Sequence, residues 1–272
     1  SAASDVYKRQ INQLGEADLT PATYSWTVVA TPDTAILTTS PGTTFDTSLN
    51  VAFGSAYPGA TFQCSLDGAS WATCTNPRAL TGLGAGTHTF RVRALNSANE
   101  ADESPASLTW TVATAETTIG TKPASAITAR TASFSFSSNA TGATFECKLD
   151  TGAWAACTSP RNLSDLALGS HTFQVRASKN GLTDATPASY TFTVNAPDTT
   201  IGSTKPAATT TDTTPSFSFA SDTTGATFEC KLDSGSWASC TSPKSYSSAL
   251  SVGSHTFQVR ASAFGATDAS PA

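Results

Sequence analysis

The sequence contains no methionine, and only 13% of its 272 residues are charged. No run of basic residues occurs in it, and its formal net charge is −5 at pH 7. A strongly basic surface is what draws a protein to nucleic acids or to anionic membranes. We therefore expect neither of them as a partner.

Long apolar segments are absent as well, and with them the usual signal for a membrane-spanning helix. Apolar residues at helical spacing are also missing, whereas Gly, Pro, Thr and Ser interrupt the chain at short intervals. This punctuation is typical of short strands joined by turns.

One segment of the sequence recurs three times. It reads ATFQCSLDGASWATCTNP at 60–77, ATFECKLDTGAWAACTSP at 143–160 and ATFECKLDSGSWASCTSP at 226–243. The first cysteines of the copies are 147 − 64 = 83 and 230 − 147 = 83 residues apart. A fixed period with a shared pattern predicts a tandem array of similar modules.

All six cysteines belong to this segment, with two in each copy: Cys64, Cys74, Cys147, Cys157, Cys230 and Cys240. The pattern predicts one disulfide per module, joining cysteines that lie opposite each other on two strands of a hairpin. Zinc is disfavoured because the cysteines of a pair are too far apart in sequence and no second pair lies nearby. Disulfides indicate an oxidising compartment, and each should stabilise its module by about 2–3 kcal/mol.

The repeat sets the expected domain boundaries. The segment ADLTPATYSWTVVATPDT at 17–34 aligns with residues 101–118 and 183–200, so the chain is expected to begin inside one repeat and to stop inside another. The first ten residues match nothing in the repeat, and the stretch from Asp5 to Gln10 resembles a translated sequencing adapter. We therefore predict an adapter scar at 1–10, the last strand of a preceding repeat at 11–30, and repeats at 31–113, 114–196 and 197–272, the third lacking its last strand.

Within each repeat the apolar residues alternate with polar ones. In HTFQVRA at 171–177, for example, Phe173, Val175 and Ala177 share one face. Alternation of this kind predicts half-buried strands. The second repeat yields strands near 117–122, 132–138, 143–149, 154–158, 162–166, 171–177 and 189–194. About seven short strands per repeat predict an all-β fold of tandem, two-sheet antiparallel sandwiches.

The recurring pattern resembles that of bacterial Ig-like repeats in large extracellular and cell-surface proteins. Its elements are F-x-C-x-L-D-x-x-x-W-x-x-C-x-x-P, G-x-H-T-F-x-V-R-A and T-D-x-x-P-A. In the second repeat these are Phe145, Cys147, Leu149, Asp150, Trp154, Cys157, Pro160, Gly169, His171, Phe173, Val175, Arg176, Ala177, Thr183, Asp184 and Pro187. The resemblance implies Ig-like sandwiches outside the cell, in stalks, adhesins or modules attached to secreted enzymes.

Catalytic residues are not expected in the sequence. Each repeat has one histidine (His88, His171 or His255) at the start of the same strand, without a second histidine or a free cysteine. We interpret these histidines as structural residues at a corner of the sandwich. No serine lies in a G-x-S-x-G context and the carboxylates are scattered singly, so we predict that the chain is not an enzyme and has no cofactor.

Calcium at the module junctions is an alternative to the absence of a cofactor. Acidic residues occur at each predicted junction and in the loop expected beside it: Asp33, Glu100, Asp102, Glu103, Glu116, Asp184, Asp198 and Asp268. Clustered carboxylates suit Ca²⁺, which takes six to eight oxygen ligands. The competing interpretation is that these are solvated loop acids.

A tryptophan recurs between the two cysteines of each repeat, at Trp71, Trp154 and Trp237. An exposed tryptophan in each module could stack on sugar rings. The alternative is that each ring covers its own hairpin and packs on stems such as those of Lys148 and Lys231. Trp26 and Trp110 align with Phe192 on the last strand and are expected in a core.

Together these patterns favour a non-catalytic stalk or spacer segment of an extracellular bacterial repeat protein or adhesin. Its expected partners are neighbouring repeats of the same chain. Two alternatives stay open: the modules bind glycans or proteins of host or neighbouring cell surfaces, or they are spacers of a large secreted hydrolase.

Overall fold

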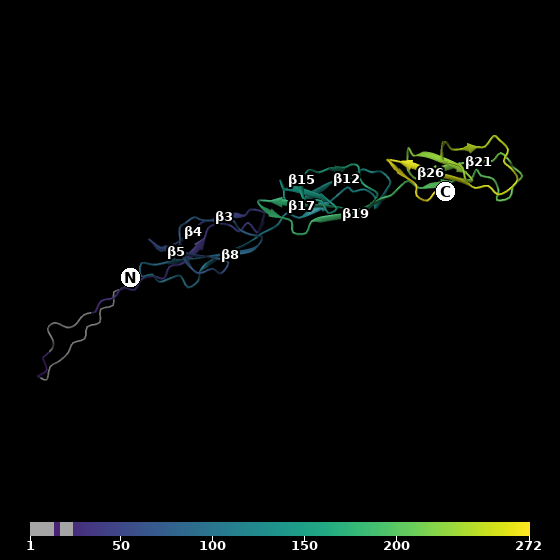
Figure 1. The fold of residues 1–272 in the computed structure, drawn as a ribbon. Coiled ribbons are helices and arrows are strands. Elements are labelled where there is room, and N and C mark those ends of the chain that lie inside the picture. Colours follow the sequence, from purple (N-terminus) through teal and green to yellow (C-terminus); the bar gives the residue numbers. More distant parts are fainter. Residues whose placement is uncertain (1–13, 17–23) are drawn as a thin grey trace. The chain divides into compact units, whose positions relative to one another are not determined.

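The computed structural model describes residues 14–16 and 24–272, and within them it contains strands but no helix (Figure 1). Consequently no helix in the described part could cross a membrane. The chain divides between Thr114 and Ala115 into two compact units. We call residues 31–113, 114–196 and 197–272 modules 1, 2 and 3. The proposed adapter scar at 1–10 lies outside the described residues.

Module 1 forms two layers of strands. They are β1 (Thr34–Ile36), β2 (Thr43–Thr44), β3 (Ser48–Val51), β4 (Phe53–Ser55), β5 (Thr61–Leu66), β6 (Ala72–Cys74), β7 (Arg78–Thr81), β8 (Gly86–Leu95) and β9 (Ala106–Val112). The larger layer has the order β2-β9-β8-β5-β6, antiparallel except for β2 with β9. In the smaller layer β1 pairs with β4 and β3 pairs with β7.

Module 2 has the same arrangement. Its strands are β10 (Thr117–Ile119), β11 (Ala126–Ile127), β12 (Ala132–Phe134), β13 (Phe136–Ser138), β14 (Thr144–Leu149), β15 (Ala155–Cys157), β16 (Arg161–Leu163), β17 (Gly169–Lys179), β18 (Leu182–Thr183) and β19 (Ala188–Val194). The larger layer has the order β11-β19-β17-β14-β15, and β18 pairs with β17. The smaller layer pairs β10 with β13 and β12 with β16.

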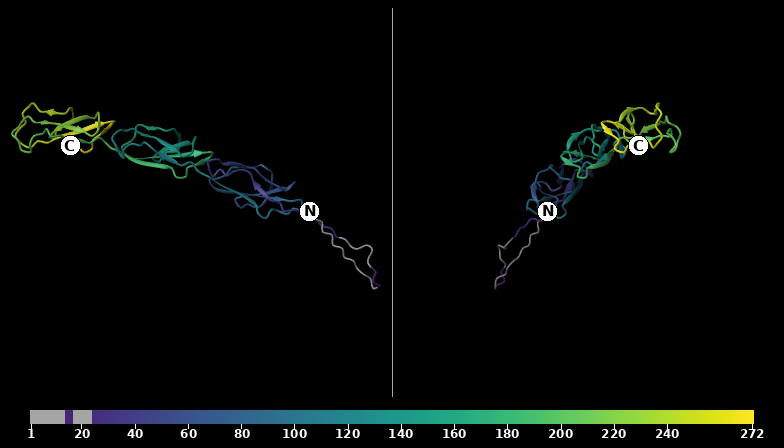
Figure 2. Two further views of the ribbon diagram at one scale, coloured as in Figure 1. Left: turned by 180° about the vertical axis from the view of Figure 1, so that it is seen from behind. Right: turned by 45° about the vertical axis from the view of Figure 1, so that its right-hand side comes forward.

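Module 3 contains β20 (Thr199–Ile201), β21 (Ser216–Phe217), β22 (Phe219–Ser221), β23 (Thr227–Leu232), β24 (Ala238–Cys240), β25 (Lys244–Ser245), β26 (Phe257–Ala263) and β27 (Ala266–Thr267). Its larger layer has the order β24-β23-β26-β27, and the smaller one pairs β20 with β22 and β21 with β25. Two further views show that each module consists of strands and loops alone (Figure 2). The prediction of an all-β fold of Ig-like sandwich modules is confirmed.

The seven strands expected in module 2 from alternation all occur, although the strand expected at 132–138 is divided into β12 and β13 by Ser135. The short strands β11 and β18 were not predicted. Each has only two residues, too few to produce a detectable alternation in the sequence.

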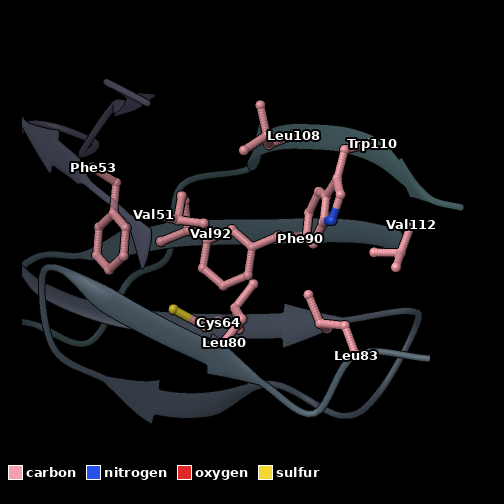
Figure 3. Close-up of a cluster of buried hydrophobic side chains, with 10 residues drawn as sticks. All are labelled: Val51, Phe53, Cys64, Leu80, Leu83, Phe90, Val92, Leu108, Trp110 and Val112. Carbon is pink, nitrogen blue, oxygen red and sulfur yellow. The ribbon is translucent and has the colours of Figure 1, made fainter. Parts of the chain in front are cut away.

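The core of module 1 lies between its two layers (Figure 3). Val51 and Phe53 enter it from β3 and β4, and Phe90, Val92 and Trp110 enter it from β8 and β9. All five side chains are buried. Because they come from both layers, the alternation seen in the sequence has its physical cause in the packing of one sheet on the other.

The cores of modules 2 and 3 are organised around stacked phenylalanine rings. The ring centroids of Phe134 and Phe173 are 4.2 Å apart, and those of Phe217 and Phe257 are 4.1 Å apart. In both pairs one ring comes from the smaller layer and the other from the long central strand of the larger layer. Aromatic stacking therefore joins the two layers directly.

We call the two strands that carry the cysteines of a module, such as β5 and β6, its Cys hairpin. A tight turn joins them. In module 1 the turn is centred on Asp67 and Gly68, both of which have positive φ (52° and 80°), and the Ala69 N–H donates to the Leu66 carbonyl at 2.9 Å. This is the backbone geometry of a type I′ turn, which suits the twist of two antiparallel strands.

The cysteines of each hairpin are joined, as Cys64–Cys74, Cys147–Cys157 and Cys230–Cys240, with Cα atoms 5.8 Å apart. They are not directly opposite, however, and the predicted register was wrong. Cys64 pairs with Ala72, and Cys74 pairs with Phe62. Because the turn is tight, β6 pairs with β5 two residues earlier than the predicted register. Ala72 and not Cys74 therefore lies opposite Cys64, and the disulfide crosses the hairpin diagonally.

Residues 24–30, which the sequence assigns to the last strand of a preceding repeat, form no strand. Trp26 is 41% exposed, whereas Trp110 and Phe192 at the matching positions are 2% and 1% exposed. The core position expected for Trp26 is therefore wrong in this structure. A last strand is buried by pairing with the central strand of its own module, and within the described residues the segment has no such partner.

Candidate functional site

A histidine and an aspartate form a contact in each module. In module 2 the Nδ1 atom of His171 lies 2.8 Å from Oδ2 of Asp150, and its Nε2 atom lies 2.9 Å from the carbonyl oxygen of Ala167. The other carboxylate oxygen of Asp150 accepts the N–H of Thr172 at 2.7 Å. The same three contacts recur at His88, Asp67, Gly84 and Thr89, and at His255, Asp233, Ser251 and Thr256.

This geometry favours a positively charged histidine. Both ring nitrogens face oxygen acceptors, and only the imidazolium form has two N–H donors. The hydrogen bond to the Ala167 carbonyl, followed by that to Asp150, raises the pKa of His171 above its ordinary value of 6.5, although burial opposes this. For Asp150, burial acts to raise the pKa, but the hydrogen bonds from His171 and Thr172 outweigh it and lower the pKa below 3.8.

The pKa values shift in the same directions in the other two modules, for His88 with Asp67 and for His255 with Asp233. The Asp–His pair joins the Cys hairpin turn to the start of the central strand, so its role in the fold is to fix that corner. The sequence correctly placed the histidines at a corner but missed their aspartate partners. The signal was present, because the Leu-Asp of the turn recurs in every copy.

The Asp–His pair does not have the geometry of a catalytic dyad. In an Asp–His–Ser arrangement, the nitrogen remote from the aspartate faces the nucleophile. Here that nitrogen is bound to a backbone carbonyl in every module. A histidine with both nitrogens engaged in this way cannot accept a proton from a nucleophile.

A second recurring group surrounds a buried aspartate after the long central strand. In module 2 Asp184 is only 2% exposed. Its Oδ1 accepts the backbone N–H and the hydroxyl of Thr186 at 2.8 and 3.1 Å, and its Oδ2 accepts the N–H of Thr117 at 3.0 Å. Burial acts to raise the pKa of Asp184, but the hydrogen bonds from Thr117 and Thr186 outweigh it and lower the pKa below 3.8.

Asp102 and Asp268 occupy the same position in modules 1 and 3, and both are 4% exposed. These aspartates and the junction acids are the residues that calcium would require as ligands. In module 2, however, both carboxylate oxygens of Asp184 already accept hydrogen bonds from the protein. No group of three or more His, Cys, Asp or Glu side chains suited to a metal occurs among residues 14–16 and 24–272. Calcium stays an untested alternative to the predicted absence of a cofactor, and melting in Ca²⁺ and then in chelator would test it.

The recurring tryptophans are half-buried and covered by cations. Over Trp154, the guanidinium carbon of Arg176 lies 4.4 Å and the Lys148 Nζ 5.1 Å from a ring centroid. Over Trp237 the corresponding distances are 4.3 Å to Arg260 and 4.8 Å to Lys231. The packing on Lys148 and Lys231 follows the prediction, whereas the two arginines were missed.

A groove of about 810 Å³ lies in module 3. Its apolar walls include Pro215, Phe217, Val252 and Phe257, from loops and strands on both sides. In module 2 the strand β19 lies between the matching segments, paired to β11 and β17. The groove in module 3 therefore lies where module 2 has the strand β19. Its walls match the segments that flank this strand rather than a small-molecule site. Ala272 pairs with Val259 in module 3, as Ala188 of β19 pairs with Val175 in module 2.

Comparison of the chain with models of protein families and with curated proteins gave no match. Solved structures that resemble it are tandem β-sandwich arrays. The fibronectin(III)-like modules of Clostridium thermocellum CbhA have 16% identity and a TM-score of 0.27, covering 60% of this chain and 94% of that one. The three N-terminal domains of the bacteriophage RB49 Hoc protein have 9% identity and a TM-score of 0.38, covering 88% and 93%. At these identities no function is transferred from them.

Proposed function

We propose that the chain is a non-catalytic spacer segment of an extracellular repeat protein, in which the modules hold other parts of that protein at a distance. The proposal rests on one observation: the polar groups that recur in the modules form their contacts within their own module. In each module the cysteines and the Asp–His pair bind other parts of the same module, and one oxygen of the buried aspartate accepts the N–H of the residue two positions later.

The junctions also support a spacer. Only residues 113–116 separate β9 from β10, and only residues 195–198 separate β19 from β20. The first strand after each junction is anchored at once, because the hydroxyl oxygens of Thr117 and Thr199 accept the N–H groups of Ala177 and Ala261 at 2.7 and 2.8 Å. Short linkers with anchored ends give a chain fewer ways to bend than long flexible ones.

The three disulfides and the absence of free cysteines among the described residues support an extracellular location, because disulfides persist in oxidising compartments. The resemblance of the Cys hairpin to bacterial Ig-like repeats supports a bacterial surface protein, a stalk or an adhesin. Thiol titration of the denatured, unreduced protein should then detect no free thiol.

Small-angle scattering of the 272-residue chain tests the spacer. We expect a distribution of interatomic distances whose shape and maximum distance do not change with salt. The matched control is a variant with Gly-Ser-Gly-Ser inserted after Thr114, which lengthens one junction and should broaden the distribution. A native chain that scatters like the insertion variant would contradict the proposal, because a spacer must keep its ends apart.

A further inference from the structure

The outer face of the larger layer in module 1 carries positive charge and no negative charge. The side chains that alternate with the core on β5, β6, β8 and β9 are Thr61, Gln63, Ser65, Thr73, Thr87, Thr89, Arg91, Arg93, Leu95, Ser107, Thr109 and Thr111. Two of these are arginines and none is an aspartate or glutamate. The face is therefore cationic and rich in hydroxyl groups, although the whole chain has a net charge of −5.

The two arginines meet over one tryptophan. The guanidinium carbon of Arg93 lies 4.5 Å and that of Arg91 lies 5.6 Å from a ring centroid of Trp71. Arg93 also donates from Nε and Nη2 to the side-chain oxygen of Gln63, at 2.9 and 2.7 Å. The ring and the amide hold the guanidinium of Arg93 in place without neutralising it, which lowers the entropy lost when an anion binds.

Modules 2 and 3 carry an acidic residue on the corresponding face and are less positively charged there than module 1. Where module 1 has Gln63, they have Glu146 and Glu229, which form salt bridges to Arg176 and Arg260 at 2.8 Å. Where module 1 has Ser65 and Arg91, module 2 has Lys148 and Gln174 and module 3 has Lys231 and Gln258. Each of these faces therefore keeps one net positive charge, whereas that of module 1 has two. Neither Arg91 nor Arg93 has an acidic partner among the described residues.

We infer that this face of module 1 binds acidic polysaccharides, with Arg91 and Arg93 contacting the carboxylate or sulfate groups of the sugar chain. Guanidinium groups match the planar, multidentate geometry of such oxyanions. The threonine hydroxyls on the flanking strands offer hydrogen bonds to sugar hydroxyls. In two places these hydroxyls already pair across strands, at 3.4 Å for Thr87 with Thr111 and at 3.3 Å for Thr89 with Thr109. This binding is independent of the spacer function.

The composition of the face favours a polysaccharide over other anionic partners. Binding of a nucleic acid gains strength with each neutralised phosphate, and two arginines supply few such contacts. A protein partner would require an apolar centre in the interface. On this face the ring of Trp71 is occupied by guanidinium groups, and hydroxyl groups make up most of the rest.

Isothermal titration of the 272-residue chain with dextran sulfate, polygalacturonate and uncharged dextran tests the inference. We expect binding of at least one of the two acidic polymers, weakened by added salt, and none of uncharged dextran. Binding to dextran sulfate alone assigns sulfate as the recognised group, and binding to polygalacturonate alone assigns carboxylate. Absence of binding to both acidic polymers would overturn the inference.

Two variants based on the chain's own repeats make the test specific. The double variant Q63E/R91Q places the residues of modules 2 and 3 at two positions of module 1 and removes the net positive charge of the face, so it should fold normally and bind at least tenfold more weakly. The reciprocal variant E146Q/K148S/Q174R gives module 2 the residues of module 1 at the three positions and should add a second site, doubling the stoichiometry.

Circular dichroism and the thermal midpoint serve as folding controls for both variants. Unchanged binding by folded Q63E/R91Q would overturn the inference. Equal binding of polyglutamate or single-stranded DNA would overturn it too, because the attraction would then be one of charge alone.

Discussion

Modules 1 and 2 differ in side-chain size at two equivalent core positions, and the difference at the second is opposite to that at the first. Val51 and Phe134 are equivalent, since each pairs with the arginine that follows the proline of the hairpin, Arg78 or Arg161. Trp110 and Phe192 are equivalent as well, since each pairs with the histidine of the central strand. Module 1 therefore combines a small residue with a large one, and module 2 combines two of intermediate size. The ring centroids of Phe134 and Phe192 are 5.7 Å apart, so the two positions are close enough to affect each other. Because the two differences are opposite in sense, we infer that the larger side chain at one position compensates for the smaller one at the other.

Breaking this compensation should have the largest effect. Replacing Phe134 by Val in module 2 removes the ring that stacks on Phe173 and leaves a cavity, which should lower the free energy of unfolding of module 2 by about 2–3 kcal/mol. Adding Phe192→Trp to Phe134→Val copies module 1 and should restore part of the loss. Urea unfolding of the two single variants and the double variant would measure this, and a strictly additive result would show that the two positions do not share volume.

The buried aspartate offers the next test. Asp184→Asn keeps the shape of the side chain but removes the charge that Thr117 and Thr186 stabilise, so we expect a loss of about 2 kcal/mol in module 2. Because the pKa of Asp184 is lowered, the stability that the carboxylate contributes is present above pH 3.8 and is lost as pH falls through its folded-state pKa. Acid unfolding monitored by circular dichroism should show this loss in the native chain and not in the variant. Asp165→Asn, at an exposed position, is the matched control.

The Asp–His pairs should give a smaller effect with the opposite pH dependence. The raised pKa of His171 means that its contribution is complete below pH 6.5 and is lost as pH rises through the folded-state pKa. Asp150 is 39% exposed, so solvent screens the pair and the loss in module 2 should be no more than about 1 kcal/mol. Calorimetry between pH 5 and pH 9 should show the midpoint falling with pH in the native protein and falling less in the variant H88Q/H171Q/H255Q. A similar fall in both proteins would assign the pH dependence to other groups.

The smallest effect is expected at Trp110. Its indole N–H is buried without a hydrogen-bond partner, which carries a cost that the phenylalanine at the matching position of module 2 avoids. Trp110→Phe combines a phenylalanine with Val51 and leaves a void, but it also removes this unpaired donor. Because the two effects oppose each other, we expect a net loss of only about 1 kcal/mol, smaller than that of Phe134→Val, as measured by thermal melting. Phe192→Leu, which removes apolar area without removing a polar group, should be clearly destabilising and serves as the control.

The sequence predicted the strands of these modules because alternation and repetition are local properties. Phe173, Val175 and Ala177 are buried on one face of β17, as their spacing indicated. The same reasoning failed for the cysteines, because the register of a hairpin depends on how many residues its turn contains. Cys64 and Ala72 pair although the alignment of the repeats cannot show it.

The contacts of the candidate sites depend on residues far apart in the sequence, and these could not be predicted from spacing. Asp150 and His171 are 21 residues apart, and Asp184 contacts Thr117 across 67 residues. Recurrence could have singled out these residues in each copy, but only their placement on neighbouring strands shows which of them meet. The cationic face of module 1 could not be predicted from spacing either, because Trp71 and Arg93 come together only when β5, β6 and β8 form one sheet.

The compensation between the two core positions has a consequence for the ancestry of the array. Duplication of a whole 83-residue unit carries both members of a compensating pair together. Recombination with a breakpoint between them would join Val51 to a partner such as Phe192, leaving a void, or Phe134 to one such as Trp110, crowding the core. Arrays of this kind are therefore expected to gain and lose complete units, and chimaeras made within a unit should be selected against.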